Sequence, residues 1–238
     1  MLISEGRERV PMLFAERLAV AFRDADGHSF NVLDAVDFAP APGRLTAVTG
    51  ASGSGKSTLL NALSGLVRLD SGRIMFDGTD VSKLSESRRD RWRRDNIGLV
   101  FQNFYLIDEL SPSGNVMVAA WFDRLSAAKL RGRADALLKE LGVPGNRKNL
   151  HGLSRGEQQR IAIARALMFD PPIILADEPT ASLDRASGRA VAALLGDLAR
   201  RDGRTVVVVT HDLDLIAAAD TIVELAHGRL ATPQAVMA

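Results

Sequence analysis

The stretch GASGSGKS, at residues 50–57, has the spacing G-x-x-x-x-G-K-S/T that holds the phosphates of a nucleotide in many proteins. Its glycines allow the backbone to wrap an anion with N–H groups pointing inward, at torsion angles that other residues resist. Lys56 can reach the β- and γ-phosphates, and the Ser57 hydroxyl can bind Mg²⁺. A flexible Gly/Ser turn is the alternative. However, an apolar stretch precedes the loop and a helical pattern follows it, so we predict a phosphate-binding loop.

The stretch IILADE, at residues 173–178, is an apolar strand pattern that ends in two carboxylates. Beside a phosphate-binding loop, Asp177 could hold Mg²⁺ through water, and Glu178 could accept a proton from an attacking water. An Asp-Glu pair after a strand is otherwise typical of a loop start or a helix cap. Because the chain also carries the phosphate-binding loop, we favour the functional interpretation.

A third apolar pattern, TVVVVT at residues 205–210, ends immediately before His211. Parallel strands present their carboxyl ends at one edge of a sheet, where ligands bind. We therefore expect His211 near the loop and the carboxylates, within reach of a γ-phosphate or the attacking water. The other histidines, His28, His151 and His227, lack such a placement and are predicted to be surface residues.

The stretch LSRGEQQR, at residues 153–160, allows two interpretations. Ser154 followed by Glu157 forms the S-x-x-E pattern of a capping box, which would begin a helix and explain both residues structurally. A serine with free N–H groups at a helix N-terminus can equally form an anion site. The peptide alone leaves both interpretations open.

Apolar strand patterns that alternate with helical patterns must position these residues, and they predict a parallel α/β sheet. Its strands are expected at residues 45–50, 96–102, 172–178 and 205–211. Helices are expected at 56–66, 86–95 and near 186–200, and over most of 103–170. The patterns at 17–22, 29–39 and 72–81 predict a small antiparallel layer, and 219–231 a strand pair.

The composition narrows the class of protein. The chain has 238 residues, with 30 basic against 29 acidic residues, and a net charge of +1 gives no reason to expect nucleic acid as a partner. The absence of cysteine excludes disulfides, thiolate metal sites and cysteine nucleophiles. No apolar run approaches the roughly 18 residues that cross a bilayer, and the N-terminus lacks the pattern of a secretory signal.

The motifs together resemble those of ABC ATPases, the motor domains of ATP-binding-cassette systems. The resemblance rests on the phosphate-binding loop, Gln102 after a strand, LSRGEQQR, IILADE, ASLD at 181–184, and His211, in that order. It covers roughly residues 14–230. It implies an α/β P-loop NTPase with a RecA-like parallel sheet core, an antiparallel β layer and an inserted α-helical subdomain at about 103–170. We expect one domain over 14–238 and an N-terminal extension at 1–13.

The resemblance also implies a site shared by two copies of the chain, packed head to tail around two ATP molecules with Mg²⁺. Catalytic roles fall to Glu178 as general base, His211 as switch residue, Gln102 and Lys56. Mg²⁺ would be held by Ser57, Gln102 and Asp177. ATP would contact Phe22, stacked on the adenine, and the loop Gly50, Ala51, Ser52, Gly53, Ser54, Gly55, Lys56, Ser57 and Thr58. The second copy would contribute Ser154, Gly156, Glu157 and Asp184, with 182–184 crossing the interface.

Phe22 has an alternative interpretation, and two residues of the signature depart from the family pattern. Phe22 could instead be a core phenylalanine of its strand. Arg155 stands where the family has the first glycine of its signature, and Glu157 stands where it usually has glutamine. The glutamate suits a capping box, whereas a long cation lies where the backbone should approach the nucleotide. We expect Arg155 to modulate the site without abolishing it.

The kind of ABC ATPase follows from length and local similarity. Ser154 lies 98 residues after Lys56, too close for the long coiled coil of the chromosome-maintenance relatives, and the chain carries one cassette rather than two. The motif regions are most similar to the lipoprotein-release, macrolide-export and cell-division group. This implies a cytoplasmic motor, peripheral on the inner face of the cell membrane, that drives export, extraction or mechanotransmission through a separate transmembrane subunit.

We expect that subunit to dock near Phe104–Leu110, within an apolar stretch that extends to Phe122, with ordinary packing as the alternative. A regulatory ATPase of a cell-envelope or cell-division complex, which transports nothing, is a second hypothesis. A soluble P-loop kinase is a third, but it would leave residues 153–160 unexplained. The basic run Arg88–Arg94 is predicted to be a solvated helix face, with anionic lipid headgroups as the alternative partner.

Overall fold

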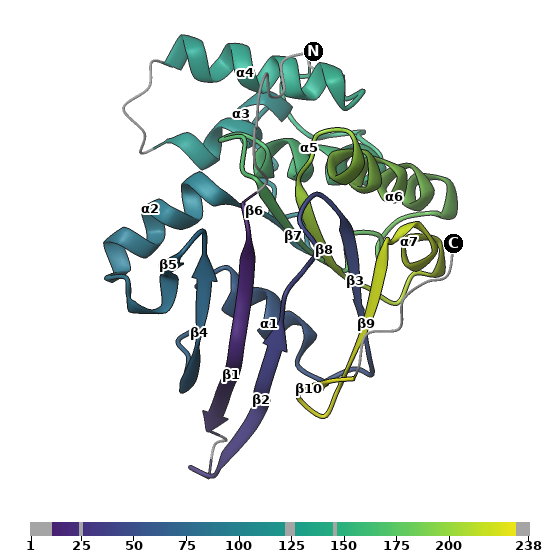
Figure 1. Ribbon diagram of the computed structural model, residues 1–238. Helices are drawn as coiled ribbons and strands as arrows, with labels where there is room; N and C mark the ends of the chain where they lie inside the picture. Colours follow the sequence, from purple (N-terminus) through teal and green to yellow (C-terminus); the bar gives the residue numbers. More distant parts are fainter. Residues whose placement is uncertain (1–10, 24–25, 122–126, 145–146, 232–238) are drawn as a thin grey trace.

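A six-stranded sheet forms the centre of the computed structural model, which describes residues 11–23, 26–121, 127–144 and 147–231 (Figure 1). The strand order is β10-β9-β3-β8-β7-β6. The strands span Leu45–Thr49 (β3), Ile97–Val100 (β6), Ile173–Asp177 (β7), Thr205–Val209 (β8), Thr221–Ala226 (β9) and Arg229–Leu230 (β10). All pairs are parallel except β9 with β10. Both faces of β8 are buried, which explains its unbroken valine run and confirms the predicted parallel sheet.

The predicted antiparallel layer is a second sheet, with the order β2-β1-β4-β5. Its strands span Leu13–Arg23 (β1), Ser29–Phe38 (β2), Ser71–Phe76 (β4) and Thr79–Asp80 (β5). Alternate residues of β1 are buried, as expected for a sheet with one apolar face. Around Arg17 the register against both neighbours shifts, and Arg17 itself has a left-handed φ of 47°. This is a β-bulge.

The helices occupy the segments in which they are predicted, except α7, which the sequence analysis missed. They span Lys56–Leu63 (α1), Glu86–Asn96 (α2), Pro112–Met117 (α3), Ala127–Glu140 (α4), Arg155–Ala166 (α5), Arg185–Arg200 (α6) and Leu213–Ala218 (α7). Two short 3₁₀ helices span Val81–Lys83 (η1) and Val118–Ala120 (η2). Helices α3, α4 and α5 pack on one another above the parallel sheet (Figure 1). No helix in the described ranges combines the length and apolar character needed to cross a membrane.

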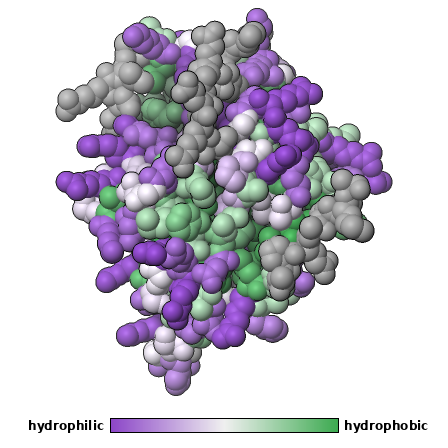
Figure 2. All heavy atoms as spheres, in the orientation of Figure 1, coloured by the Kyte–Doolittle hydropathy of each residue, from purple (hydrophilic) through white to green (hydrophobic). Residues whose placement is uncertain are grey.

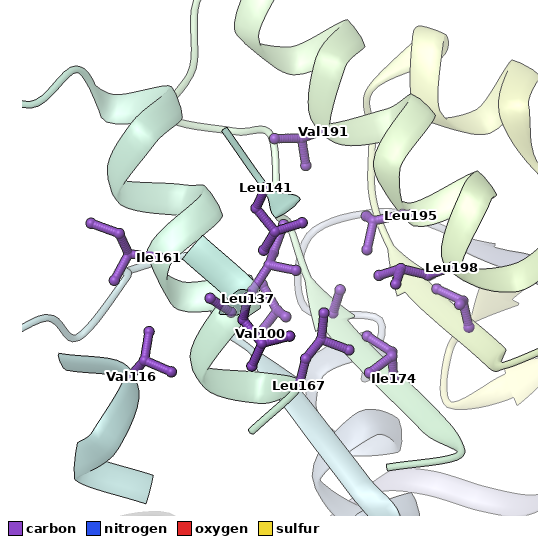
Figure 3. Packing of buried hydrophobic residues seen from close by; sticks show 14 of the residues in the cluster. Val100, Val116, Leu137, Leu141, Ile161, Leu167, Ile174, Val191, Leu195 and Leu198 are labelled. Atoms are coloured by element: carbon purple, nitrogen blue, oxygen red, sulfur yellow. The ribbon is translucent and has the colours of Figure 1, made fainter. Parts of the chain in front are cut away.

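Two apolar clusters cover the two faces of the parallel sheet. The first joins β6 and β7 to the helices on one face (Figure 3). Its members include Val100, Val116, Leu137, Leu141, Ile161, Leu167, Ile174, Val191, Leu195 and Leu198. The second joins α1 and the antiparallel sheet to the other face, through residues such as Leu18, Leu59 and Val207. The helical segment therefore shares one continuous core with the sheet.

The basic run on α2 is only partly the solvated face that the sequence predicts. Arg88 and Arg91 are exposed, but the Arg93 guanidinium donates to the carbonyls of Ser64 and Gly65 at 2.9 and 2.8 Å. These bonds fix α2 against the end of α1. Hydrophilic side chains line the edge of the molecule formed by α2, β5 and β4, whereas hydrophobic ones gather over the middle of the face shown in Figure 2.

Candidate nucleotide-binding site

The loop at residues 50–57 leaves β3 and enters α1, as predicted, and its conformation depends on glycine. Gly50 and Gly55 have φ angles of 140° and 102°, and Gly55 is the residue that precedes α1. A Cβ on Gly55 would lie 2.7 Å from the Val32 carbonyl oxygen, and one on Gly50 would collide with the Leu225 carbonyl. The two glycines thus allow the loop to turn tightly beneath β2 and β9 and leave its N–H groups at the start of a helix.

Lys56 is buried, with 7% of its surface exposed, although it begins α1. Its ammonium group donates to the carbonyls of Gly50 and Ala51 at 2.7 and 2.9 Å. A buried cation needs such partners. The loop therefore holds the Lys56 ammonium at the N-terminus of α1. A phosphate group at this position would be stabilised by the ammonium and by the positive end of the helix dipole.

A cavity of about 970 Å³ opens above this loop. It brings together most of the residues that the sequence analysis selects: Phe22, Ser52, Gly53, Gly55, Lys56, Ser57, Thr58, Gln102, Asp177, Glu178 and His211. They come from the carboxyl ends of β3, β6, β7 and β8 and from the tip of β1. Gly50, Ala51 and Ser54 belong to the same loop but do not line the cavity.

The carboxylates lie at the end of β7, beside Val209 of β8. The Glu178 N–H donates to the Val209 carbonyl at 2.9 Å, and Glu178 has a left-handed φ of 45°. The His211 Nε2 lies 3.5 Å from Glu178 Oε1, and the His211 N–H donates to Oε2 at 3.4 Å. Burial raises the pKa of Glu178, while His211 acts in the opposite direction. A carboxylate with a raised pKa in a cleft is suited to proton transfer.

The donor set around Ser57 fits a hard divalent cation. Ser57, Asp177 and Gln102 line the cavity together, and each offers oxygen. Within the described ranges there is no group of three or more His, Cys, Asp or Glu residues placed to hold a metal. A donor set with a single carboxylate, a hydroxyl and an amide fits Mg²⁺. This ion is usually held by one or two carboxylates together with substrate phosphates and water, rather than by a protein cage.

Two aromatic side chains form the outer wall of the cavity. Phe22 is 43% exposed, so the alternative interpretation as a core residue is wrong. It pairs in register with Phe30 of β2, which is 51% exposed and lines the same cavity with Val32. The sequence analysis missed Phe30 and Val32. The predicted antiparallel layer contained the signal, because pairing Arg23 with Ser29 places Phe30 opposite Phe22.

The signature residues do not reach this cavity. Ser154, Gly156 and Glu157 lie at the start of α5, where the predicted capping box is confirmed. The Glu157 N–H donates to the Ser154 hydroxyl at 3.2 Å, and the Ser154 N–H donates to the Glu157 carboxylate at 2.7 Å. The bond from the Ser154 backbone lowers the pKa of Glu157. The capping-box interpretation of this peptide is therefore correct. It does not exclude the anion-site interpretation, in which the start of α5 would contact the nucleotide of a second molecule.

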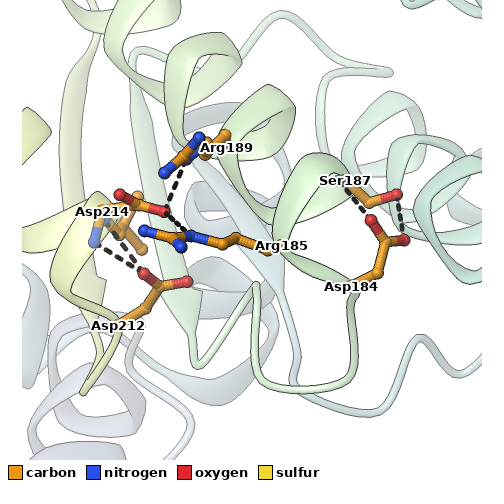
Figure 4. A network of polar contacts seen from close by, with 7 residues as sticks. Asp184, Arg185, Ser187, Arg189, Asp212 and Asp214 are labelled. Atoms are coloured by element: carbon orange, nitrogen blue, oxygen red, sulfur yellow. Dashed lines mark hydrogen bonds and ion pairs between the residues drawn. The ribbon is translucent and has the colours of Figure 1, made fainter.

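Asp184 is also outside the cavity, at the start of α6 (Figure 4). Its carboxylate accepts from the N–H and the hydroxyl of Ser187 at 3.0 and 2.7 Å. The Ser187 hydroxyl oxygen would lie 2.7 Å from a Cβ on Gly156, so only glycine allows α5 and α6 to approach this closely. Asp184 and the signature thus lie on one surface, linked by Ser187, which the sequence analysis missed.

Two arginines of α5 hold the segment in which docking is predicted. The Arg165 guanidinium donates to the carbonyls of Tyr105 and Phe104 at 2.5 and 2.6 Å. The Arg155 guanidinium lies over the Phe104 ring, 5.7 Å from its centroid. Tyr105 and Ile107 are 65% and 37% exposed. The Arg155 side chain therefore packs on Phe104 and connects the signature to this segment, instead of binding nucleotide on its own chain.

Comparison with known proteins agrees with this geometry. Residues 33–181 match the ABC transporter family. A dimeric structure of the bacterial ABC transporter cassette MJ0796 superposes with a TM-score of 0.86 and 34% identity, covering 95% of this chain and 100% of that one. A post-hydrolysis dimer of the same cassette, bound to ADP and phosphate, matches equally well.

This chain belongs to the ABC transporter family. It carries the ATP-binding cassette, the family's ATPase domain with the fold of a P-loop NTPase, and this decides against the kinase hypothesis. The chain is 39% identical to the lipoprotein-releasing system ATP-binding protein LolD 2 of Rhodopirellula baltica, over 84% of this chain and 81% of that protein. It is 41% identical to the macrolide export ATP-binding/permease protein MacB of Sodalis glossinidius, over 92% of this chain. There it spans only 34% of the relative's length.

Proposed function

We propose that this chain is the ATP-hydrolysing subunit of a membrane transport complex, which acts as a dimer on a separate transmembrane subunit. The observation that carries the proposal is a division of the site. One cavity collects the phosphate-binding loop, two carboxylates and His211, whereas the signature of the same chain lies outside it. A second copy, packed head to tail, would bring its signature to that cavity.

In this proposal the residues that line the cavity bind ATP and hydrolyse it from the positions that they occupy in this structure. The loop and Lys56 bind the β- and γ-phosphates of ATP, and Phe22 with Phe30 covers the base. Glu178 takes a proton from water as its oxygen attacks the γ-phosphorus, the bond from that phosphorus to the β,γ-bridging oxygen breaks, and ADP and phosphate leave. His211 holds the Glu178 carboxylate and contacts the γ-phosphate.

Mg²⁺ bound by Ser57, Gln102 and, through water, Asp177 would neutralise the phosphate charge that develops during hydrolysis. Gln102 is the second residue after β6 and lies two residues before Phe104. It is thereby suited to report the state of the nucleotide to the segment that we propose for docking. Ser154, Gly156, Glu157 and Asp184 would act on the partner's nucleotide rather than on their own.

We propose that the transmembrane subunit docks on Phe104–Leu110 and the adjoining groove. An open groove of about 330 Å³ lies between α2, β6, η2 and α5, with Phe101 and Phe169 among its apolar residues and Arg94 and Arg165 among its cations. The two relatives named above, a macrolide export ATP-binding/permease protein and a lipoprotein-releasing system ATP-binding protein, support a membrane partner. The chain would then be peripheral on the inner face of the membrane. We assign the cassette to residues 14–238, with 103–170 as its helical subdomain.

The test uses a tagged Glu178→Gln variant in its native host. Since hydrolysis is blocked, ATP with Mg²⁺ should hold the chain as a closed dimer on its partner, and ADP should not. The complex is purified from solubilised membranes, its mass is measured, and its components are identified by mass spectrometry. A dimer with a transmembrane protein of a transport system supports the proposal, and a partner that only signals would identify a regulatory ATPase. A monomer in ATP would contradict the shared site.

A further inference from the structure

A second cavity of about 970 Å³ lies away from the nucleotide site and shares none of its residues. Its walls come from the bulged part of β1, the connection between α1 and β4, the start of β4, η1 and α2. These elements lie at the edge where hydrophilic side chains gather (Figures 1 and 2). The proposed hydrolysis cycle does not use this cavity.

The cavity carries more positive than negative charge. Five cations and three acids line it: Arg17, Arg68, Arg73, Lys83 and Arg89, with Glu16, Asp70 and Asp80. Two of the cations are neutralised, because Arg73 lies 2.6 Å from Glu16 and Lys83 lies 3.3 Å from Asp80. The third acid, Asp70, already accepts from the Ala21 N–H at 2.7 Å.

Three guanidinium groups around this cavity then remain without an acceptor among the described residues. In the part of the chain that the structure describes, the side chains of Arg17, Arg68 and Arg89 form no ion pair or hydrogen bond. Arginine offers five N–H donors in a fixed fork that matches the oxygens of a phosphate or carboxylate. Three such forks around one space are suited to bind a phosphate-bearing anion.

Arg89 carries the strongest of these observations. Its Nε is buried and has no hydrogen-bond partner among the described residues. Its aliphatic stem lies over Gly65, where a Cβ would come within 2.9 Å of Arg89 Cδ. The bonds from Arg93 to Ser64 and Gly65 fix both walls of this contact. A buried donor held in place without an acceptor is rare in native proteins and points to a ligand.

The bulge at Arg17 is the second observation. Arg17 adopts a left-handed φ of 47°, which is unfavourable for a residue with a Cβ, and its N–H donates to the Asp37 carboxylate at 2.8 Å. Gly72 opposite has no side chain, and a Cβ there would collide with the Arg17 carbonyl. Bulges redirect side chains next to functional sites, and strain of this kind is retained where a function requires it.

We propose that this second cavity binds a phosphate-bearing anion through Arg17, Arg68 and Arg89. The cavity is larger than a single phosphate, and the partly exposed Val67 and Leu69 add apolar surface to it. The ligand class is therefore an organic phosphate or diphosphate, either free or as the headgroup of an anionic phospholipid. Its binding would be independent of the nucleotide site.

The test compares three proteins, each loaded with one equivalent of ADP, so that the phosphate-binding loop is filled and no free ADP competes for the second cavity. They are the wild type, the triple variant Arg17→Ala/Arg68→Ala/Arg89→Ala, and a control, Arg88→Ala/Arg91→Ala/Arg131→Ala, that loses the same charge from exposed positions outside the cavity. Inorganic pyrophosphate is titrated by calorimetry. Vesicles of phosphatidylglycerol are tested by co-sedimentation against vesicles of phosphatidylcholine.

Wild type and control should bind alike, and the triple variant at least about tenfold more weakly, because each lost fork removes charge-assisted hydrogen bonds. A difference seen with pyrophosphate identifies a free phosphate ligand. A difference seen only with phosphatidylglycerol identifies a headgroup. If the wild type binds neither probe, or if the triple variant or the control contradicts this order, the proposal is wrong.

A single substitution keeps the test valid if the triple variant does not fold. Arg17→Gly relieves the left-handed strain, so it should raise the melting temperature while weakening the binding of the probe that the wild type prefers. A purely structural bulge would give the higher melting temperature with unchanged binding. That result would overturn the role of Arg17.

Discussion

At the scale of single residues, Glu178 combines burial, a left-handed backbone and a histidine partner in one position. Burial favours the protonated form, and His211 favours the carboxylate. The balance keeps the pKa above that of an ordinary glutamate, which strengthens the carboxylate as a base.

We expect Glu178→Gln to lower the ATPase rate by roughly 10²–10⁴, because it removes the proton acceptor without changing the shape of the site. Steady-state phosphate release measures this. In the wild type, the rate should fall with decreasing pH as Glu178 becomes protonated. Unchanged turnover in the variant would show that another group takes the proton.

The same substitution should stabilise the protein at neutral pH. A folded-state pKa raised above the unfolded value means that the native state loses stability as pH rises through this interval. Glutamine avoids that cost. The variant should therefore melt at a higher temperature than the wild type at pH 7 to 8, and the difference should shrink near pH 4, close to the unfolded pKa of glutamate. Thermal melts over this range test the sign.

Arg155 stands where the family has the first glycine of its signature. It stacks over Phe104 and is exposed, so it is not a phosphate ligand on its own chain. We expect Arg155→Gly to keep the ATPase rate within about tenfold, a change of roughly 1.4 kcal/mol in the barrier. Complete loss of activity in a folded variant would show that the arginine is essential to the shared site.

At the scale of elements, the capping box gives α5 a defined start, and Ser154 serves both stability and the proposed site. Ser154→Ala should lower the free energy of unfolding by about 1 kcal/mol, or the melting temperature by about 2–4 °C. Glu157→Gln, which retains the box, is the control. The contribution of Glu157 is complete above the unfolded pKa and is lost as pH falls through its lowered folded pKa.

The segment Phe104–Leu110 is the element that should distinguish basal from coupled activity. Ile107→Glu adds a charge to its exposed apolar surface and should abolish stimulation of the ATPase by the transmembrane subunit while leaving the basal rate unchanged. Met12→Glu, at another exposed apolar position, is the matched control. Loss of both rates in Ile107→Glu would indicate misfolding or a catalytic role instead.

The sequence predicts elements well where a local pattern determines them. The strands β3, β7 and β8 follow from apolar runs, and α5 follows from its capping box. Phe30 was missed although antiparallel pairing of the first two strand patterns places it opposite Phe22. Ser187 was missed because its role depends on a close contact between α5 and α6 that no local pattern reveals. The cavity arginines Arg17, Arg68 and Arg89, which have no side-chain partner in the described ranges, were also missed, since charge counted along a chain does not show which acids are already used. Phe122 lies outside the described residues, so its predicted part in docking stays a prediction.

At the scale of the whole molecule, the separation of the signature from the cavity predicts complementation between copies. Lys56→Ala removes the phosphate contact, and Ser154→Asp keeps the helix cap but adds a negative charge toward a bound phosphate. Each variant alone should be inactive. Mixed together, they should recover up to about a quarter of the wild-type rate, because half of the dimers contain one intact site. No recovery in mixed dimers would place both residues in the same site.

Residues 154–157 lie outside the nucleotide cavity of their own chain, and this changes how the ATPase rate depends on protein concentration. If neither copy holds a complete site, turnover in dilute solution should rise with the square of the protein concentration and become linear only when most copies are paired. A transmembrane subunit that holds two copies together replaces this bimolecular step with a high effective concentration. Copies left without that scaffold would then consume little ATP, so the split site restricts hydrolysis to assembled complexes without any dedicated inhibitor.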